Sequence, residues 1–322
     1  MSEADLASAA RIALRDCLGL TRGESLLVLT DQALAPIGRA LLAAGRELTD
    51  RVLYLEMTAS GVDGNEPPPE VAQLMAQVSV VAAPTSRSLT HTQARRAACA
   101  AGARVATLPG ITEDTLVRCL NADYDAIARR TARVAEVLTA GRVAHLTSEA
   151  GCDLLLPIEG IAAIASTGIV RARGSFGNLP SGEAYLMPVE GASQGVLVVD
   201  GSMAGLGRIE DAPIRVEVAD GRAVSVTGGR EAARLLAMMD AAGAAARNVA
   251  ELGVGTNERA RITGTILEDE KILGTVHVAF GNNVSMGGTV AVPFHLDGVV
   301  LRPTLHVDGQ MLLDRGAPCF LT

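Results

Sequence analysis

The sequence contains no tryptophan, and its other aromatic residues are limited to three tyrosines and four phenylalanines among 322 residues. So few rings leave little scope for binding a large planar ligand by stacking. Cysteine is also scarce. The five cysteines are odd in number and none belongs to a CxxC pair: Cys17, Cys99, Cys119, Cys152 and Cys319. This pattern argues against a disulfide framework and gives no sign of a zinc site built from thiolates.

Clustered positive charge is missing as well. The net charge is −8 at pH 7, the isoelectric point is about 5.2 and no basic stripe occurs, so we expect no nucleic-acid partner. The N-terminus lacks the basic start and apolar core of a signal peptide. No apolar run approaches the roughly 18 residues of a membrane span. We therefore expect a cytoplasmic enzyme without membrane association.

The first part of the chain alternates predicted strands with predicted helices. The strands are expected at 22–31, 51–57, 78–84 and 103–110, and the helices at 35–48, 70–77, 91–102 and 124–140. Strands separated by helices of about ten residues indicate crossover units and a parallel sheet. We therefore predict a Rossmann-like, doubly wound α/β domain over residues 1–141. No G-x-G-x-x-G follows its first strand, so we expect no dinucleotide site.

From residue 142 onward, short apolar stretches are separated by glycine-containing turns. Asp-Gly pairs at 200–201, 220–221 and 308–309 are typical of tight turns between antiparallel strands. One helical pattern, at 230–247, interrupts them. We predict a β-rich α+β domain over residues 142–322, with candidate ligands on its turns and strand ends.

Five residues of this second part have the side chains of metal ligands. His277 alternates with apolar neighbours in GTVHVAF, and His295 and Asp297 are two residues apart in FHLDG, so that both point to one face of a strand. Glu183 follows a Pro-Ser-Gly turn, and Glu251 is predicted to end a helix. Imidazole with carboxylate is a ligand set that zinc, manganese and ferrous iron accept. We therefore predict a divalent metal centre.

Two neighbouring features leave alternatives open. A second H-x-D pair, His306 and Asp308, could replace the first, although Asp308 begins an Asp-Gly turn, where aspartate is favoured without any metal. The sole lysine, Lys271, could orient a carboxylate or bind a substrate anion, or could lie on the surface. Four aromatic residues flank the candidate ligands and could line a cleft or belong to the core: Phe176, Tyr185, Phe280 and Phe294.

The segments GNLPSGEAY, ELGVGTN and EKILGTVHVAFGNN, followed by the H-x-D pair, resemble in order and spacing the thermophilic metallo-aminopeptidases T and S. The resemblance covers most of the second domain. It implies a homodimeric exopeptidase that holds two zinc, cobalt or manganese ions. Its metal ligands would be Glu183, Glu251, His277, His295 and Asp297, and Glu251 would also transfer protons. The expected function is then removal of N-terminal amino acids from small peptides.

Two departures from that family favour a different reading. Position 284 is valine where the aminopeptidases have a tyrosine ligand, and only 18 positions separate His277 from His295. The second domain also resembles the 2,5-dihydroxypyridine ring-cleaving dioxygenases, which hold one ferrous ion with two histidines and an aspartate. His277, His295 and Asp297 match that set by residue type. The alternatives are therefore an Fe(II) dioxygenase acting on a small aromatic substrate, or a metal-free binding protein.

Overall fold

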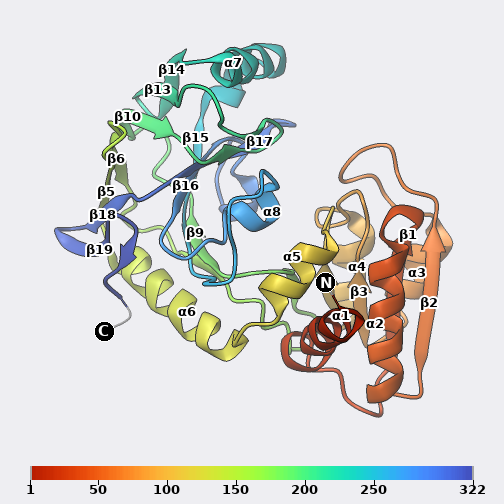
Figure 1. Ribbon diagram of the computed structural model, residues 1–322. Helices are drawn as coiled ribbons and strands as arrows, with labels where there is room; N and C mark the ends of the chain where they lie inside the picture. The colour runs from red at the N-terminus through yellow and green to blue at the C-terminus, as the bar shows by residue number, and fades with distance from the viewer. Residues whose placement is uncertain (1, 321–322) are drawn as a thin grey trace. The chain divides into compact units, whose positions relative to one another are not determined.

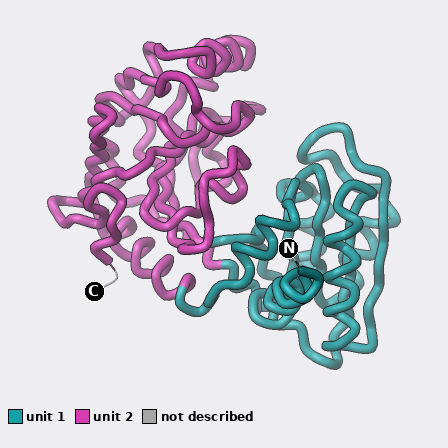
Figure 2. The backbone as a smooth tube through the Cα atoms, in the orientation of Figure 1, with its two compact units in different colours: residues 1–126, 168–181 teal, residues 127–167, 182–322 magenta. Residues whose placement is uncertain are grey.

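The computed structural model describes residues 2–320 and divides the chain into two compact units (Figures 1 and 2). Unit 1 contains the residues up to Ala126 together with Gly168–Ser181, and unit 2 contains the remainder. The sequence suggested a single boundary between residues 141 and 142. The observed division differs in two ways. Residues 127–141 belong to unit 2, and 168–181 returns to unit 1 and adds a strand to its sheet, a long-range pairing without a local sequence signal.

Unit 1 is built on a five-stranded parallel sheet in the order β2-β1-β3-β4-β8. Its strands are β1 (Leu26–Asp31), β2 (Val52–Met57), β3 (Val80–Ala83), β4 (Arg104–Thr107) and β8 (Phe176–Asn178). Every residue of β1 is buried, as expected for a parallel strand covered on both faces. Strand β8, which follows unit 2 residues in the chain, was not predicted.

Helices cover both faces of this sheet. They are α1 (Glu3–Arg11), continued by a π-helix (Ile12–Cys17), a 3₁₀ turn (Gln32–Leu34), α2 (Ala35–Leu48), α3 (Pro69–Met75), α4 (Gln93–Ala101) and α5 (Glu113–Leu120). Leu27 and Leu29 share an apolar cluster with residues of α3 and α4. On the opposite face, Leu26 packs against Gly45 of α2. The predicted doubly wound α/β architecture is confirmed.

Unit 2 is formed by two antiparallel sheets. The first has the order β14-β13-β10-β6-β5-β18-β19-β20, and the second the order β12-β11-β17-β16-β15-β9-β7. The first sheet comprises β5 (Val143–Thr147), β6 (Asp153–Pro157), β10 (Gln194–Val199), β13 (Ile214–Ala219), β14 (Arg222–Thr227), β18 (Thr304–Val307), β19 (Gln310–Asp314) and β20 (Ala317–Pro318). The second comprises β7 (Ile164–Ser166), β9 (Glu183–Leu186), β11 (Ser202–Met203), β12 (Gly207–Arg208), β15 (Val249–Gly255), β16 (Val276–Gly281) and β17 (His295–Val300). The predicted β-rich character is confirmed.

Helices complete the core of unit 2. They are α6 (Tyr124–Ala140), most of which belongs to this unit, α7 (Arg230–Ala242) and α8 (Ile266–Asp269), with 3₁₀ turns at Ala244–Arg247 and Val284–Met286. A single apolar cluster takes buried side chains from both sheets and from α6 and α7, for example Leu154, Val254, Leu138 and Leu235. None of the helices within residues 2–320 has the length and apolar character that crossing a bilayer requires.

Two of the three Asp-Gly pairs form hairpin turns as predicted. Asp220 and Asp308 have φ angles of 49° and 48°, and each is followed by a glycine with positive φ between paired strands. This is the conformation that favours Asp-Gly in tight hairpins. The pair at 200–201 instead links β10 to β11, which lie in different sheets. There the Asp200 carboxylate accepts a hydrogen bond from the backbone N–H of Leu301.

Candidate metal centre

Four adjacent strands of the second sheet bring the five predicted ligands to one face. Glu183 begins β9, Glu251 lies in β15, His277 in β16, and His295 and Asp297 in β17. The strand register pairs Gly255 with Glu183, Gly253 with His277, Ala279 with Asp297 and Gly281 with His295. Cross-strand partners share a face, as do residues two apart, so all five side chains project from the same side of the sheet.

Small residues on the same face make room for this cluster. His277 and Glu183 have glycine partners on β15, and His295 and Asp297 have a glycine and an alanine partner on β16. A Cβ atom added at Gly253 would lie 2.0 Å from Nε2 of His277, so this glycine is required for the imidazole to lie flat across its neighbouring strand. The Gly-rich strands were visible in the sequence, but only the register shows that the glycines surround the ligands.

Glu251 stands at the centre of the cluster. One of its oxygens, Oε1, is 3.4 Å from Nε2 of His277, and the other, Oε2, is 3.4 Å from Nε2 of His295. His295 Nε2 is in turn 3.6 Å from Oδ1 of Asp297. Glu251 does not end a helix as predicted: it lies within strand β15, whose seven residues are all buried. A strand buried on both faces shows no alternation of polar and apolar residues, which is why the sequence pattern was misread.

The spacing of these atoms fits a bound cation. Distances of 3.4 to 3.6 Å are long for hydrogen bonds between charged groups. By contrast, two atoms each about 2.1 Å from one tetrahedrally coordinated ion lie about 3.4 Å apart. Glu251, His295 and Asp297 form a group whose potential ligand atoms all lie within 4.8 Å of one another. The residues present therefore fit a divalent metal ion.

The orientation of His295 also suits a ligand. Its Nδ1 lies 2.7 Å from the backbone carbonyl oxygen of Asn282, to which it can donate a hydrogen bond. With the proton held at Nδ1, the lone pair of Nε2 points toward Glu251 and Asp297. Ligating histidines are commonly oriented by such a hydrogen bond from the second ring nitrogen. His295 also keeps 34% of its side-chain surface exposed, whereas Glu251 keeps 10%, so the centre is open to solvent on the His295 side.

A second group of potential ligands adjoins the first. Glu183, Glu270 and His277 also place one ligand atom each within 4.8 Å of one another. Between the two carboxylates lies the sole lysine: Nζ of Lys271 is 2.8 Å from Oε1 of Glu183 and is hydrogen-bonded to Glu270. Only 1% of the Lys271 side chain is exposed. The surface position considered for this lysine is therefore excluded.

Glu270 was missed by the sequence reasoning, whereas Tyr185 had been considered as a residue that could line a cleft beside the ligands. Tyr185 lies two residues after Glu183 in β9 and opposite Gly253, so its ring is on the ligand face. Burial, followed by the charges of Glu183 and Glu251, raises the pKa of Tyr185 well above its usual value, so the phenol stays protonated. For Glu270, the only available signal was its position next to the isolated Lys271.

The potential ligand atoms that lie within 4.8 Å of one another form other groups than the set that the dioxygenase resemblance implied. The resemblance joined His277, His295 and Asp297 as one set. In the structure, His295 and Asp297 group with Glu251, whereas His277 groups with Glu183 and Glu270. The reason is the strand order: β15 and β17 flank β16 on opposite sides, and the Glu251 side chain reaches past β16 to the histidine of β17.

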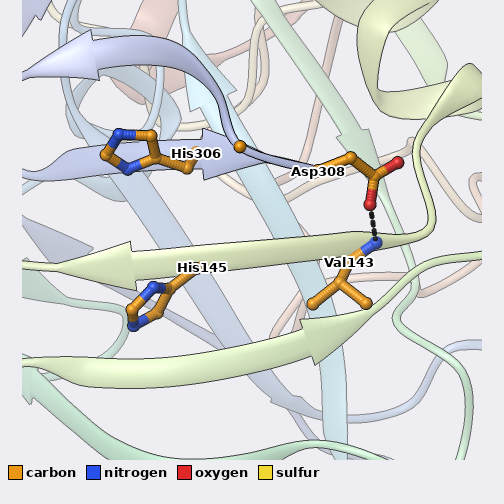
Figure 3. A pocket seen from close by; sticks show the side chains of 5 residues that line it. Val143, His145, His306 and Asp308 are labelled. Atoms are coloured by element: carbon orange, nitrogen blue, oxygen red, sulfur yellow. Dashed lines mark hydrogen bonds between the residues drawn. The ribbon is translucent and has the colours of Figure 1, made fainter.

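The second H-x-D pair lies elsewhere in unit 2, on the first sheet. His306 is the cross-strand partner of His145, and the Asp308 carboxylate accepts a hydrogen bond from the backbone N–H of Val143 (Figure 3). The same carboxylate accepts a second hydrogen bond from the backbone N–H of Arg142. Within the described part of the chain, neither His306 nor Asp308 belongs to a group of three potential metal ligands. Asp308 therefore has the structural role that its Asp-Gly turn indicated.

The four aromatic residues are divided between the two units. Phe176 belongs to β8 of unit 1, where the guanidinium of Arg95 lies 4.2 Å from its ring centroid. Phe280 is fully buried in the core of unit 2, and Phe294 packs against that core. Of the four rings considered, Tyr185 is the one that the strand register places on the ligand face. The core interpretation therefore holds for Phe280.

Without a metal, the charges of the cluster balance by protonation. Burial alone would lower the pKa of His277, but the hydrogen bond to Glu251 and the charges of Glu183, Glu251 and Glu270 outweigh burial and raise it to about 9. Burial likewise disfavours charge on His295, yet Asp297 and Glu251 raise its pKa well above the usual value. The pKa of Asp297 falls to about 2 because the charge and hydrogen bond of His295 outweigh its burial.

These shifts predict a pH-dependent metal affinity. A metal ligand must be a neutral imidazole, so binding displaces a proton from each protonated histidine that coordinates. Below the raised pKa of His295 the affinity for Co²⁺ should therefore rise with pH, by roughly tenfold per pH unit for each displaced proton. Competitive titrations at several pH values measure this slope. An affinity independent of pH between 6.5 and 8.5 would contradict it.

The raised pKa of His277 makes the stability of the metal-free protein fall as the pH rises. The folded-state pKa of His277 lies above its ordinary value of 6.5, so its protonation stabilises the fold most fully below that value. This contribution is lost as the pH rises through about 9. The melting temperature of the metal-free protein should accordingly fall over this range, while metal-loaded protein is protected.

Comparison with known proteins shows a match to one protein family. A family model described as 2,5-dihydroxypyridine 5,6-dioxygenase (NicX) matches residues 6–319. The 2,5-dihydroxypyridine 5,6-dioxygenase of Pseudomonas putida KT2440 is 25% identical over an alignment of 215 residues that covers 63% of this chain. The alignment spans about three fifths of that relative's own length, 61%.

Solved structures show the same fold. The structure of 2,5-dihydroxypyridine dioxygenase from Pseudomonas putida KT2440 superimposes with a TM-score of 0.85 at 21% identity, covering 99% of this chain and 98% of that one. AmpT from Thermus thermophilus superimposes with a TM-score of 0.72 at 19% identity, covering 99% of this chain and all of the other. At these identities the likeness concerns the fold alone.

The prediction of an aminopeptidase-type hydrolase is wrong. The family model and the curated relative are both dioxygenases, and the likeness to AmpT is structural. The motifs that suggested a peptidase form strands and turns of this fold, and their glycines leave space for the side chains on the ligand face. These motifs therefore identify the fold and not the reaction. Val284, at the position of the peptidase tyrosine, was the local sign of a different chemistry.

Proposed function

This chain belongs to the 2,5-dihydroxypyridine 5,6-dioxygenase family, and from that membership we propose that it is a non-haem Fe(II) dioxygenase that opens the ring of a small hydroxylated aromatic or N-heterocyclic compound. The observation that carries the proposal is the family match over residues 6–319. The buried cluster of imidazole and carboxylate groups supports it, because such ligands suit ferrous iron.

We propose that Glu251, His295 and Asp297 hold the iron, and that His277 and Glu183 border it. A ferrous ion, when bound, supplies the redox chemistry that lets dioxygen react with an aromatic ring. Asp297 and Glu251 provide negative charge from the buried side, whereas the partly exposed His295 borders the side open to solvent. Substrate would therefore approach from the His295 side.

Two further groups of this chain can act on protons or substrate oxygens. The protonated phenol of Tyr185, on the ligand face, can donate a hydrogen bond to a hydroxyl oxygen of the substrate. Burial, together with the charges of Glu183 and Asp297, outweighs the nearby ammonium of Lys271 and raises the pKa of Glu270 to about 8. A carboxyl group with such a pKa exchanges its proton near neutral pH, and in its ionised form it pairs with the ammonium of Lys271.

The decisive test is oxygen consumption by protein purified without air and loaded with Fe²⁺. With 2,5-dihydroxypyridine or a dihydroxybenzene as substrate, we expect one dioxygen to be consumed per ring opened, with loss of the ring absorbance and both oxygen atoms in the product. Zn²⁺-loaded protein is the control, since zinc has no redox chemistry, and it should consume none. Fe²⁺-loaded protein that consumes no oxygen with hydroxylated pyridines or benzenes would refute the proposal.

Assembly is a separate proposal. The aminopeptidase resemblance implied a homodimer, and we retain this expectation for the dioxygenase. Sedimentation equilibrium of the metal-loaded chain measures it directly: a mass of twice 33.1 kDa supports a dimer, and a mass of 33.1 kDa excludes it.

A further inference from the structure

The ligand face of unit 2 contains two adjoining cation positions rather than one. Glu251, His295 and Asp297 surround the first, and Glu183, Glu270 and His277 surround the second. The two are linked by Glu251, because one of its oxygens faces His295 and the other faces His277, each at 3.4 Å. A carboxylate shared in this way is a feature of two-metal sites. By ligand count alone, the chain could hold two ions.

The second position already contains a cation from the chain itself. The ammonium of Lys271 is 2.8 Å from Glu183 and hydrogen-bonded to Glu270, and its side chain is 1% exposed. Each of the two carboxylates thus uses one oxygen to bind this ammonium. The other oxygen of Glu183, Oε2, is buried without a hydrogen bond and lies 3.5 Å from Nε2 of His277.

We propose that the Lys271 ammonium takes the place of a second metal ion, so that this centre binds a single divalent ion at Glu251, His295 and Asp297. A second divalent ion between Glu183, Glu270 and His277 would lie within a few ångströms of the ammonium. Repulsion between two buried positive charges at such a distance is strong because little water screens it. The lysine ammonium is a compact cation that is covalently attached to the chain. The larger, planar guanidinium of arginine, which supplies the other basic residues of this sequence, would not reproduce this role.

The proposal is tested by counting metal ions, with Co²⁺ as the probe. It rests on the metal binding of the proposed function but not on ring cleavage. Wild-type chain dialysed against Co²⁺ should contain one ion. Lys271→Met, which keeps the length but removes the charge, should contain two, the second being the weaker. Glu270→Gln is the matched control: it breaks the same ion pair but keeps the ammonium, so it should still contain one.

Two cobalt ions in the wild-type chain, or no cobalt at all, would overturn the proposal, as would one ion in a folded Lys271→Met. If Lys271→Met unfolds without metal, its melting temperature is measured against Co²⁺ concentration. Added Co²⁺ should then stabilise this variant more than the wild type, and an equal or smaller gain counts against the proposal. One bound ion without oxygen uptake by the iron-loaded protein refutes the proposed function and leaves this inference standing. Two bound ions together with oxygen uptake refute this inference and leave the proposed function standing.

Discussion

Replacement of His295 by alanine is expected to abolish stable metal binding and, with it, oxygen consumption. The imidazole lies 3.4 Å from Glu251 and 3.6 Å from Asp297, and its removal leaves two carboxylates as the remaining ligands of the first position. We expect the affinity for Fe²⁺ or Co²⁺ to fall at least about a hundredfold. Metal analysis of anaerobically loaded protein measures the loss directly.

The chain provides a matched control for this substitution. His306 occurs in the same H-x-D pattern but lies on the first sheet, opposite His145. His306→Ala should therefore retain metal content and oxygen uptake. His306→Ala should leave the free energy of unfolding of the metal-free protein within about 1 kcal/mol of the wild type. His295→Ala should lower it, because the substitution removes the imidazolium that faces the buried carboxylates of Glu251 and Asp297. Equal losses of metal in the two variants would contradict the assignment of the centre to the second sheet.

Replacement of Gly253 by alanine is expected to damage the centre without removing any ligand. The new Cβ would lie 2.0 Å from Nε2 of His277. The imidazole is fully buried, so it can move only by displacing its neighbours Glu183 and Glu251. We expect a loss of about 1–3 kcal/mol in the free energy of unfolding, as for other overpacked cores, together with a loss of metal affinity of at least tenfold.

Gly298→Ala separates these two effects. Gly298 lies in β17 next to Asp297, but its side faces away from the ligands, and an added Cβ would meet Val199 and Met203 at 2.6 and 2.9 Å. This variant should lose stability to a similar degree through overpacking. Its metal affinity should stay close to that of the wild type. Chemical denaturation and Co²⁺ titration of both variants provide the comparison. If both glycine variants lost metal equally, a general loosening of the sheet would explain the result instead.

The parts of the fold that depend on neighbours in sequence were predictable. The alternation of strands and helices in unit 1 identified β1 to β4, and Asp-Gly pairs identified the hairpin turns at Asp220 and Asp308. Strand β8 was not predicted, because a three-residue strand gains its hydrogen bonds from β4, which lies more than 60 residues earlier in the chain. The division into units was hidden for the same reason.

For the candidate centre, residue type and spacing were sufficient to select Glu183, Glu251, His277 and the pair His295 and Asp297, all of which the structure gathers on one face. Residue type could not show how they group. Glu270 went unnoticed because a carboxylate next to a lysine is ordinary in sequence. It becomes unusual only when both side chains are buried.

By itself, the sequence determined the class of fold and the supply of ligands, since hydrophobic periodicity and turn residues act over a few positions. Only the tertiary structure decided which candidate ligands lie close together and where the lone lysine points. Strand register sets which side chains lie opposite one another in a sheet. Burial makes the Lys271 ion pair stronger and fixes its geometry, because little water screens the charges.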